Sequence, residues 1–278
     1  MLKQKIVERM VSFSGTQAKV ARFILENSRE APFMTASQIA QAVGVSESSV
    51  IRFASSLGYS GYPELKDAMK SLLLDQMTTI ERMAMHDHEP NDSAYHRMIA
   101  MDILDLREAQ SRLDFRLIRE WAREAVAAPS LYLAAQRSSV ILAQYLRFYL
   151  SWFLPSVRLL DDTLIREQLS VAPPRSMVIG ISFPRYSRWT VEAMNMARSL
   201  GFRLTVITNR SDGPMSDVKP EYVLTVPSRH ISFVDSFTAP MSLINCLIVA
   251  VADQLGDLTK ERLRRLEAMW ERDSVYMF

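Results

Sequence analysis

Five short apolar runs, separated by helical patterns, dominate the chain beyond Pro129 and restrict its fold more than any other feature. The runs begin at Leu131, Val157, Met177, Arg203 and Tyr222. Strands that alternate with helices are joined by right-handed crossovers and pair in parallel. We therefore predict an α/β unit over residues 111–278, with a doubly wound, mostly parallel five-stranded sheet. The same pattern predicts a turn and a short helix around Gly213.

The first 77 residues, in contrast, carry only helical patterns. Thr35 and Gln38 have capping-box spacing at the start of one short helix, which Gly44 ends. Ser46 is a favourable N-cap for the next helix, whose apolar positions Val50, Phe53, Ala54 and Leu57 share one face. Two short helices joined by a glycine turn are typical of helix-turn-helix DNA-binding units. We predict such an all-α domain over residues 1–77.

The second of these helices is predicted to present a polar outer face to DNA. Its members are Glu47, Ser48, Ser49, Arg52, Ser55 and Ser56. Arg52 is the side chain able to form two hydrogen bonds with a guanine or a phosphate. The chain has 33 basic and 31 acidic residues, a net charge of +2, so the DNA prediction depends on this local pattern rather than on overall charge.

Residues 78–110 are predicted to be a linker followed by a connecting helix. Their first part has no regular spacing of apolar residues, whereas the later part has helical spacing. His86, Asp87, His88 and Glu89 lie in this linker beside Pro90. We interpret them as a solvated charged run, and no metal site is predicted.

The chain's cysteine content and its N-terminus favour a cytoplasmic protein. One cysteine, Cys246, excludes an internal disulfide and suits a reducing compartment. The N-terminal segment lacks the apolar stretch of a secretory signal. No segment reaches eighteen apolar residues without a charged residue, so no membrane span is predicted.

Hydroxyl and basic side chains follow the first and third predicted strands. They are Ser138, Ser139, Ser182, Arg185, Ser187, Arg188 and Thr190. Ligands of doubly wound sheets lie at the carboxyl ends of the strands, where helix N-termini favour anions. We predict that these side chains bind a small anionic metabolite; the alternative is that the serines only cap helices and the arginines are solvated.

A family resemblance adds to this interpretation. The segments GVSESSVIRFASSLGYSGYPELK, from Gly44 to Lys66, and TQAKVARFILEN, from Thr16 to Asn27, resemble the N-terminal winged-helix-like domain of the RpiR/MurR family of bacterial transcriptional regulators. The resemblance implies that residues 46–56 form the recognition helix. It also implies that Tyr59, Tyr62 and Lys66 lie near the phosphate backbone.

That family joins its DNA-binding domain to a SIS (sugar isomerase) domain, and the resemblance implies phosphosugar contacts by the serines and Thr190 named above. The chain departs from the SIS pattern at two turns. Ala135, Gln136 and Arg137 replace the common Gly-x-Gly, and residues 183–188 replace a Ser-Gly pair. The predicted ligand is therefore a phosphosugar or another small anion, such as a carboxylate.

We predict a transcriptional regulator that binds double-stranded DNA as a homodimer at least and responds to this metabolite. One alternative is a phosphosugar isomerase, which needs a general acid or base; His230 is available but has no evident partner. Another is a helical head that binds protein instead of DNA. Neither a Gly-x-Gly-x-x-Gly motif nor a P-loop follows a strand, so no cofactor is predicted.

Overall fold

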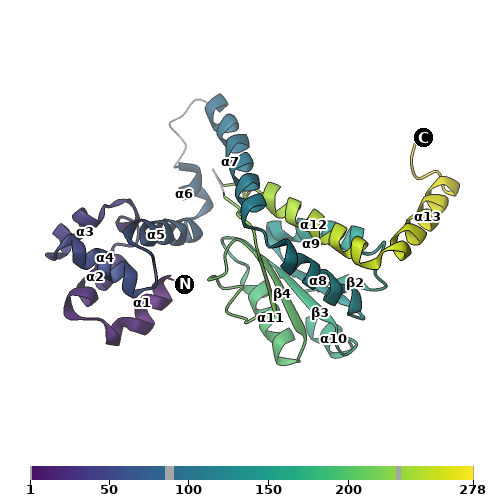
Figure 1. Ribbon diagram of the computed structural model, residues 1–278, viewed down its shortest axis with the longest axis horizontal. Coiled ribbons are helices and arrows are strands. Elements are labelled where there is room, and N and C mark those ends of the chain that lie inside the picture. The colour runs from purple at the N-terminus through teal and green to yellow at the C-terminus, as the bar shows by residue number, and fades with distance from the viewer. Residues whose placement is uncertain (1, 85–90, 230–232, 278) are drawn as a thin grey trace. The chain divides into compact units, whose positions relative to one another are not determined.

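The computed structural model describes residues 2–84, 91–229 and 233–277 and divides the chain into two compact units. The first unit comprises Met1–Ala84 and the second Met85–Phe278 (Figure 1).

The first unit is helical throughout its described residues. Its elements are α1 (Leu2–Arg9), α2 (Gly15–Glu26), α3 (Ala36–Val43), α4 (Glu47–Ser56), α5 (Tyr62–Gln76) and α6 (Thr79–Ala84), with short 3-10 turns at Met10–Ser12 and Ala31–Phe33. Ile6, Ile39 and Phe53, all fully buried, are part of one apolar core that the first five helices share. The predicted all-α domain is confirmed, but residues 2–84 contain no strand, so the β-hairpin of a winged helix is missing from this part of the chain.

The turn between α3 and α4 forms as the sequence predicts. Thr35 Oγ1 accepts a hydrogen bond from the Gln38 N–H at 3.2 Å, and Gln38 Oε1 accepts one from the Thr35 N–H at 2.7 Å. This capping box satisfies two N–H groups at the start of α3. Gly44 ends the helix with φ 70° and ψ 45°, a left-handed conformation that favours glycine.

The second unit contains one five-stranded sheet, and every pair of neighbouring strands is parallel. The strands are β1 (Leu131–Ala135), β2 (Val157–Leu159), β3 (Met177–Ile181), β4 (Arg203–Thr208) and β5 (Tyr222–Thr225), in the order β2-β1-β3-β4-β5. This confirms the predicted sheet. The strand order reverses between β1 and β3, which is the switch point where doubly wound sheets bind ligands.

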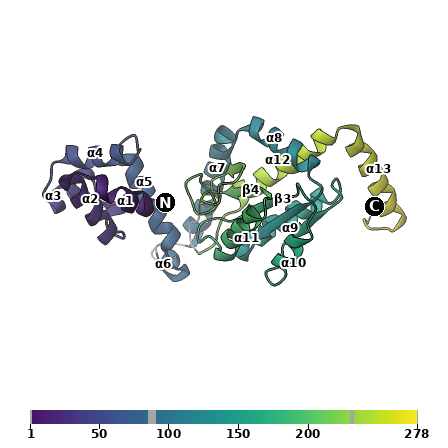
Figure 2. The same cartoon turned by 90° about the horizontal axis from the view of Figure 1, so that it is seen from below.

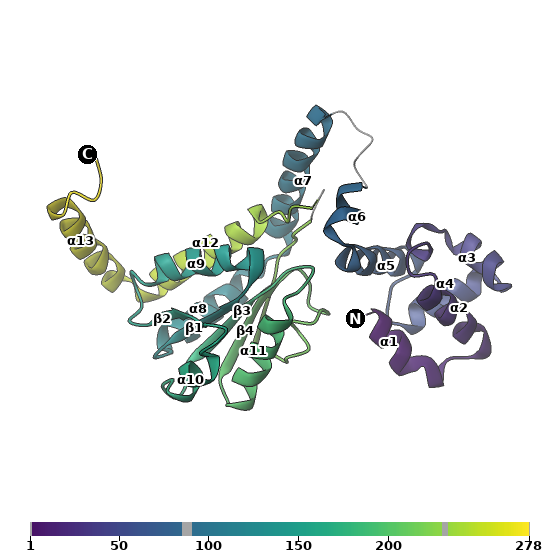
Figure 3. The same ribbon diagram turned by 180° about the vertical axis from the view of Figure 1, so that it is seen from behind.

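Helices cover both faces of this sheet (Figures 2 and 3). The helices of the second unit are α7 (Asn91–Arg112), α8 (Phe115–Ala127), α9 (Val140–Leu150), α10 (Ile165–Ser170), α11 (Arg188–Ser199), α12 (Thr238–Leu255) and α13 (Asp257–Arg272). The core on one face is formed with α8, α9 and α12, and the core on the other with α10 and α11. Around Gly213 the predicted turn is confirmed but the predicted short helix is wrong: residues 211–218 form turns and a bend, since Gly213 and Pro214 both disfavour a helix.

Within the described ranges, α12 is the one helix long and apolar enough to cross a membrane by length and composition. Leu243, Leu247 and Val251 on one of its sides are fully buried in the core of the second unit. Helix α12 is therefore packed by this side into the core of the α/β fold.

Candidate functional site

The outer face of α4 is exposed and combines polar and apolar side chains. Its exposed members are Glu47, Ser48, Ile51, Arg52 and Ser55. Ile51 is 42% exposed and was missed by the sequence interpretation, although it lies three and four residues from Ser48 and Ser55 on the same helical face. An apolar side chain here suits contact with a thymine methyl group.

Ser46, Ser49 and Arg52 form a hydrogen-bonded cluster at the start of α4. Ser46 occupies the N-cap position as predicted, but its hydroxyl caps no backbone N–H; its Oγ lies 2.8 Å from the Oγ of Ser49 and 2.9 Å from that of Ser48. Arg52 donates from Nη2 to Ser49 Oγ at 3.1 Å. Ser49 is only 8% exposed, so its predicted place on the outer face is wrong; it holds Arg52 instead.

Contacts at and just after the last residue of α4 stabilise this end of the helix and attach it to α1. Ser56 Oγ donates to the carbonyl of Phe53 at 2.7 Å, and Arg9 donates to the carbonyl of Ser56. The Lys5 ammonium lies 5.4 Å from the centre of the half-buried Tyr59 ring. These contacts fix the C-terminal end of the candidate recognition helix.

Tyr62 and Lys66 bind the turn that precedes α3. Tyr62 donates its hydroxyl to the carbonyl of Met34 at 2.8 Å, and the Lys66 ammonium donates to the carbonyl of Phe33 at 3.2 Å. Tyr62 is 7% exposed, which gives it a structural role in place of the predicted position near DNA phosphates.

We expect the first unit to lose stability in strong alkali through Tyr62. Burial raises the pKa of Tyr62 from 10.0 to about 12. A raised folded-state pKa stabilises the fold below the unfolded pKa, and this contribution disappears as the pH rises from about 10 to 12. Burial and the neighbouring Tyr149 raise the pKa of Tyr145 as well. A spectrophotometric titration of the full chain should therefore show a late tyrosine signal that Tyr62→Phe reduces by one residue. A Tyr59→Phe variant is the control, and a titration in which Tyr62→Phe leaves the late signal unchanged would contradict the assignment.

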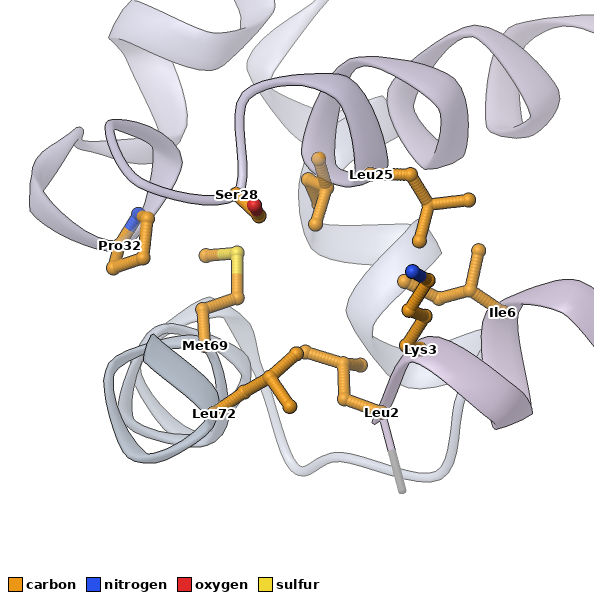
Figure 4. A pocket seen from close by; sticks show the side chains of 9 residues that line it. Leu2, Lys3, Ile6, Leu25, Ser28, Pro32, Met69 and Leu72 are labelled. Atoms are coloured by element: carbon orange, nitrogen blue, oxygen red, sulfur yellow. The ribbon is translucent and has the colours of Figure 1, made fainter. Parts of the chain in front are cut away.

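A small apolar pocket lies in the first unit among α1, α2, α5 and the turn before α3 (Figure 4). Its lining consists of Leu2, Lys3, Ile6, Ile24, Leu25, Ser28, Pro32, Met69 and Leu72. Most of these side chains belong to the core of this unit, so we assign the pocket no ligand.

In the second unit, Ser187 connects the two loops at the switch point of the sheet. Its N–H donates to Ser182 Oγ at 3.1 Å, and its hydroxyl donates to Gln136 Oε1 at 3.1 Å. The same hydroxyl accepts the N–H of Thr190 at 3.2 Å and so caps α11. The loops after β1 and β3 therefore meet where the sequence predicts an anion site, and Gln136 is a member that the prediction missed.

Two arginines in these loops adopt a backbone conformation that glycine favours. Arg137 has φ 56° and Arg185 has φ 64°, both in the left-handed region that glycine favours. The turns thus form without the glycines common in SIS domains. Such strain in a loop is retained only where the surrounding structure enforces it.

The remaining predicted side chains differ in their surroundings. Ser139 is buried, and Thr190 is fully buried with no hydrogen-bond partner for its Oγ1 among the described residues; the same is true of Thr208 at the end of β4. Ser138 is exposed and donates to the carboxylate of Asp235 at 3.1 Å. Arg188 has a side chain that is 92% exposed and pairs with Glu192 at 2.8 Å, so it lies in solvent.

An acidic row on α7 binds the segment between β5 and α12. Asp105, which is 1% exposed, accepts the backbone N–H of Arg229 at 2.9 Å and also its guanidinium, which contacts Glu108 as well. Asp102 accepts hydrogen bonds from the hydroxyls of Ser236 and Thr238, the latter at 2.8 Å. Sequence periodicity gave no sign of this contact, because its two sides are more than 120 residues apart.

Burial by itself would lower the pKa of Arg229, but the neighbouring carboxylates of Glu108 and Asp105 outweigh this effect, so the pKa of Arg229 is raised.

His230, considered above as a general base, and the His86–Glu89 run lie outside the described residues. Within the parts of the chain that are described, no group of three His, Cys, Asp or Glu side chains is arranged for a metal ion.

Comparison with known proteins agrees with both units. Residues 1–75 match the model of the helix-turn-helix domain of the rpiR family, and residues 126–250 match that of the SIS domain. The chain is 31% identical over 214 residues to the HTH-type transcriptional regulator HexR of Pseudomonas aeruginosa, covering 74% of this chain and 73% of HexR. The chain belongs to the RpiR family. This RpiR-family protein is a helix-turn-helix transcriptional regulator with a SIS domain, which confirms the predicted regulator over the isomerase alternative.

Solved structures share the fold of this RpiR-family regulator. The NanR protein of Vibrio vulnificus, in complex with ManNAc-6P, has a TM-score of 0.59 at 18% identity and covers 98% of both chains. The sugar isomerase domain of an RpiR transcription factor from Sphaerobacter thermophilus has a TM-score of 0.58 at 21% identity, covering 62% of this chain and 97% of that domain.

Proposed function

We propose that the SIS domain binds a phosphosugar or a related small anion between the loops after β1 and β3. The observation that carries this proposal is Ser187, whose hydroxyl connects Gln136 to the N-terminus of α11. Hydroxyls and helix N-termini are groups that bind phosphate oxygens. The ManNAc-6P complex of NanR, which shares this fold, supports the same ligand class.

The ligand contacts in this proposal are the hydroxyls close to the switch point. The set is Ser138, Ser139, Ser182, Ser187 and Thr190, with Arg185 after β3. Thr190 is the strongest structural candidate, since its buried Oγ1 has no partner among the described residues and an unsatisfied buried hydroxyl is costly. We leave Arg188 out because it pairs with Glu192 in solvent.

We propose that α4 is the recognition helix and reads an operator in the major groove. Glu47, Ser48, Ile51, Arg52 and Ser55 are exposed along it. The N-terminal half of a recognition helix contacts base edges, and Arg52 is already oriented there by Ser49. A regulator that binds chromosomal DNA acts in the cytoplasm, and two half-sites require a homodimer.

Ligand and DNA binding are coupled, in this proposal, through α7. Ser138 donates to Asp235, and the next residue, Ser236, donates to Asp102 on α7. A ligand that takes over the hydroxyl of Ser138 releases Asp235 and so alters the support of α7. In the proposed domain plan, residues 78–110 connect the DNA-binding domain (1–77) to the effector domain (111–278), and a ligand that prefers one arrangement changes DNA affinity by linkage.

A thermal-shift screen of the full chain tests the effector proposal. The panel contains ManNAc-6P, other phosphosugars and small carboxylates, because a ligand that binds the folded state raises the unfolding midpoint. We expect a phosphosugar to raise the midpoint and Ser187→Ala to reduce that shift by at least half. Ser170→Ala is the matched control, since the Ser170 hydroxyl donates to the carbonyl of Glu167 at the exposed end of α10.

Two outcomes of this screen count against the proposal. A shift with carboxylates alone replaces the phosphosugar by a non-sugar anion. A phosphosugar shift that Ser187→Ala leaves unchanged places the ligand away from the switch point.

A further inference from the structure

A row of polar side chains lies across the carboxyl ends of three neighbouring strands. Gln136, Ser182 and Thr208 are neighbours in this row, because the register pairs the residues directly before them in β1, β3 and β4. Side chains alternate between the faces of a sheet, so the row shares the face of Ala134 and Val206, which α10 and α11 cover. Helix α11 contacts both β3 and β4 there (Figure 3). The polar row therefore reaches one strand beyond the switch point.

The loop after β3 binds the first two members of this row. Ser187 donates its N–H to Ser182 and its hydroxyl to Gln136. Thr208 is fully buried, and its Oγ1 has no hydrogen-bond partner within the part of the chain that the structure describes. An unsatisfied buried hydroxyl costs free energy, so the end of β4 favours a polar ligand group next to the one bound at the switch point.

The loop after β4 brings a guanidinium and a phenol to the same place. Tyr186, from the loop after β3, donates its hydroxyl to Asn209 Oδ1 at 2.6 Å. A Cβ atom at Gly213 would lie 3.1 Å from the hydroxyl oxygen of Tyr186 and 3.3 Å from Nε of Arg210. The loop is thus closely packed against these two side chains, and this packing holds the phenol and the guanidinium beside each other.

The guanidinium of Arg210 is suited to an anion of the ligand. Its side chain is 18% exposed, and its ion pair with the half-exposed Asp212 has an N–O distance of 3.5 Å. Charge-assisted hydrogen bonds are normally about 2.7–2.9 Å long. A carboxylate or phosphate that forms two hydrogen bonds with this guanidinium is therefore bound more strongly than Asp212.

The charges at this edge of the sheet also favour an anionic ligand. Arg137, Arg185 and Arg210 lie in the loops after β1, β3 and β4, respectively, and these loops contain one acidic residue, Asp212. Asp235, from the segment before α12, contacts the loop after β1 through Ser138. Positive charge remains in excess, which attracts anions in preference to neutral sugars.

We propose that the effector site has a second anion subsite, formed by Tyr186, Thr208, Asn209 and Arg210, and that the effector carries an anionic group at each end. The inference rests on the proposed phosphosugar site at the switch point and narrows its ligand class. Neighbouring strands lie about 4.8 Å apart, so β4 ends about 5–10 Å from the loops after β1 and β3. The carbon chain of a six-carbon sugar spans such a distance. The ligand is therefore a phosphosugar with a second phosphate or a carboxylate at its other end.

Isothermal titration calorimetry of the full chain with two matched pairs of ligands tests the subsite. Fructose 6-phosphate and fructose 1,6-bisphosphate differ by a phosphate, and glucose 6-phosphate and 6-phosphogluconate differ by a carboxylate. We expect the doubly anionic member of one pair to bind at least about 10-fold more tightly, the effect of one added hydrogen bond to a charged group. The pair that shows this preference identifies the second group.

Replacing Arg210 should remove the preference without abolishing binding. In Arg210→Gln we expect both members of the pair to bind with nearly the wild-type affinity for the singly anionic one. Tyr186→Phe keeps the ring and the charges, and it should reduce the preference through the lost hydroxyl. Arg175→Gln is the matched control, since Arg175 is exposed before β3, at the opposite edge of the sheet. Circular dichroism establishes that the variants are folded.

The outcomes separate this inference from the proposed function. A wild-type chain that binds none of the four sugar phosphates contradicts the phosphosugar class itself. Equal affinities within both pairs overturn the second subsite and leave the phosphosugar proposal in place. A preference that Arg210→Gln and Tyr186→Phe both retain also overturns the subsite, because the second anion is then bound elsewhere.

Discussion

Replacing Arg229 by alanine should destabilise the second unit by about 1–3 kcal/mol. The substitution removes the guanidinium that contacts Asp105 and Glu108, and Asp105 is 1% exposed. Asp105 is buried and loses its charged partner, but the Arg229 side chain is 42% exposed and the backbone N–H of residue 229 still donates to Asp105, so the cost is that of a lost charged hydrogen bond. The substitution also weakens the contact between α7 and the segment that precedes α12, which the hydrogen bonds of Asp102 with Ser236 and Thr238 still maintain.

The chain offers a convenient measurement of this effect. All four tryptophans, Trp121, Trp152, Trp189 and Trp270, lie in the second unit. Urea unfolding followed by tryptophan fluorescence therefore reports on that unit. Arg188→Ala is the matched control: its pair with Glu192 is exposed, so we expect about 0.5 kcal/mol or less. If both substitutions lower the free energy of unfolding equally, the contact of Arg229 with α7 contributes no more to stability than an exposed ion pair.

Arg52→Ala should cost about 1–3 kcal/mol of operator affinity, roughly 5- to 150-fold. Arg52 is exposed on α4, and its hydrogen bond to Ser49 limits its freedom before DNA binds. The measurement is fluorescence anisotropy of the full chain with an operator selected from random DNA, at several salt concentrations. Arg116→Ala, at an exposed arginine of α8, is the control.

The pattern of loss distinguishes what Arg52 contacts. If it binds a base, the substitution weakens the operator and relaxes specificity at one position. If it binds a phosphate, affinity falls alike for all sequences and the salt slope decreases by about 1. Unchanged affinity and unchanged salt slope would remove Arg52 from the interface.

The sequence by itself determined the elements and their order. Capping at Thr35, the glycine turn at Gly44 and five apolar runs each depend on residues close in the chain, so their pattern predicts helices and parallel strands directly. The two positions of hydroxyl side chains at the sheet edge followed from the same logic, since parallel strands end at one edge.

Only the tertiary structure decided which side chains meet. Ser49 is buried one helical turn before Phe53, on the side of α4 that packs against the core, and the polar identity of serine does not reveal this. Gln136 reaches Ser187 across 51 residues, and Asp105 reaches Arg229 across 124. Periodicity reports how a residue is placed within its own element, whereas these contacts depend on how separate elements are placed against one another.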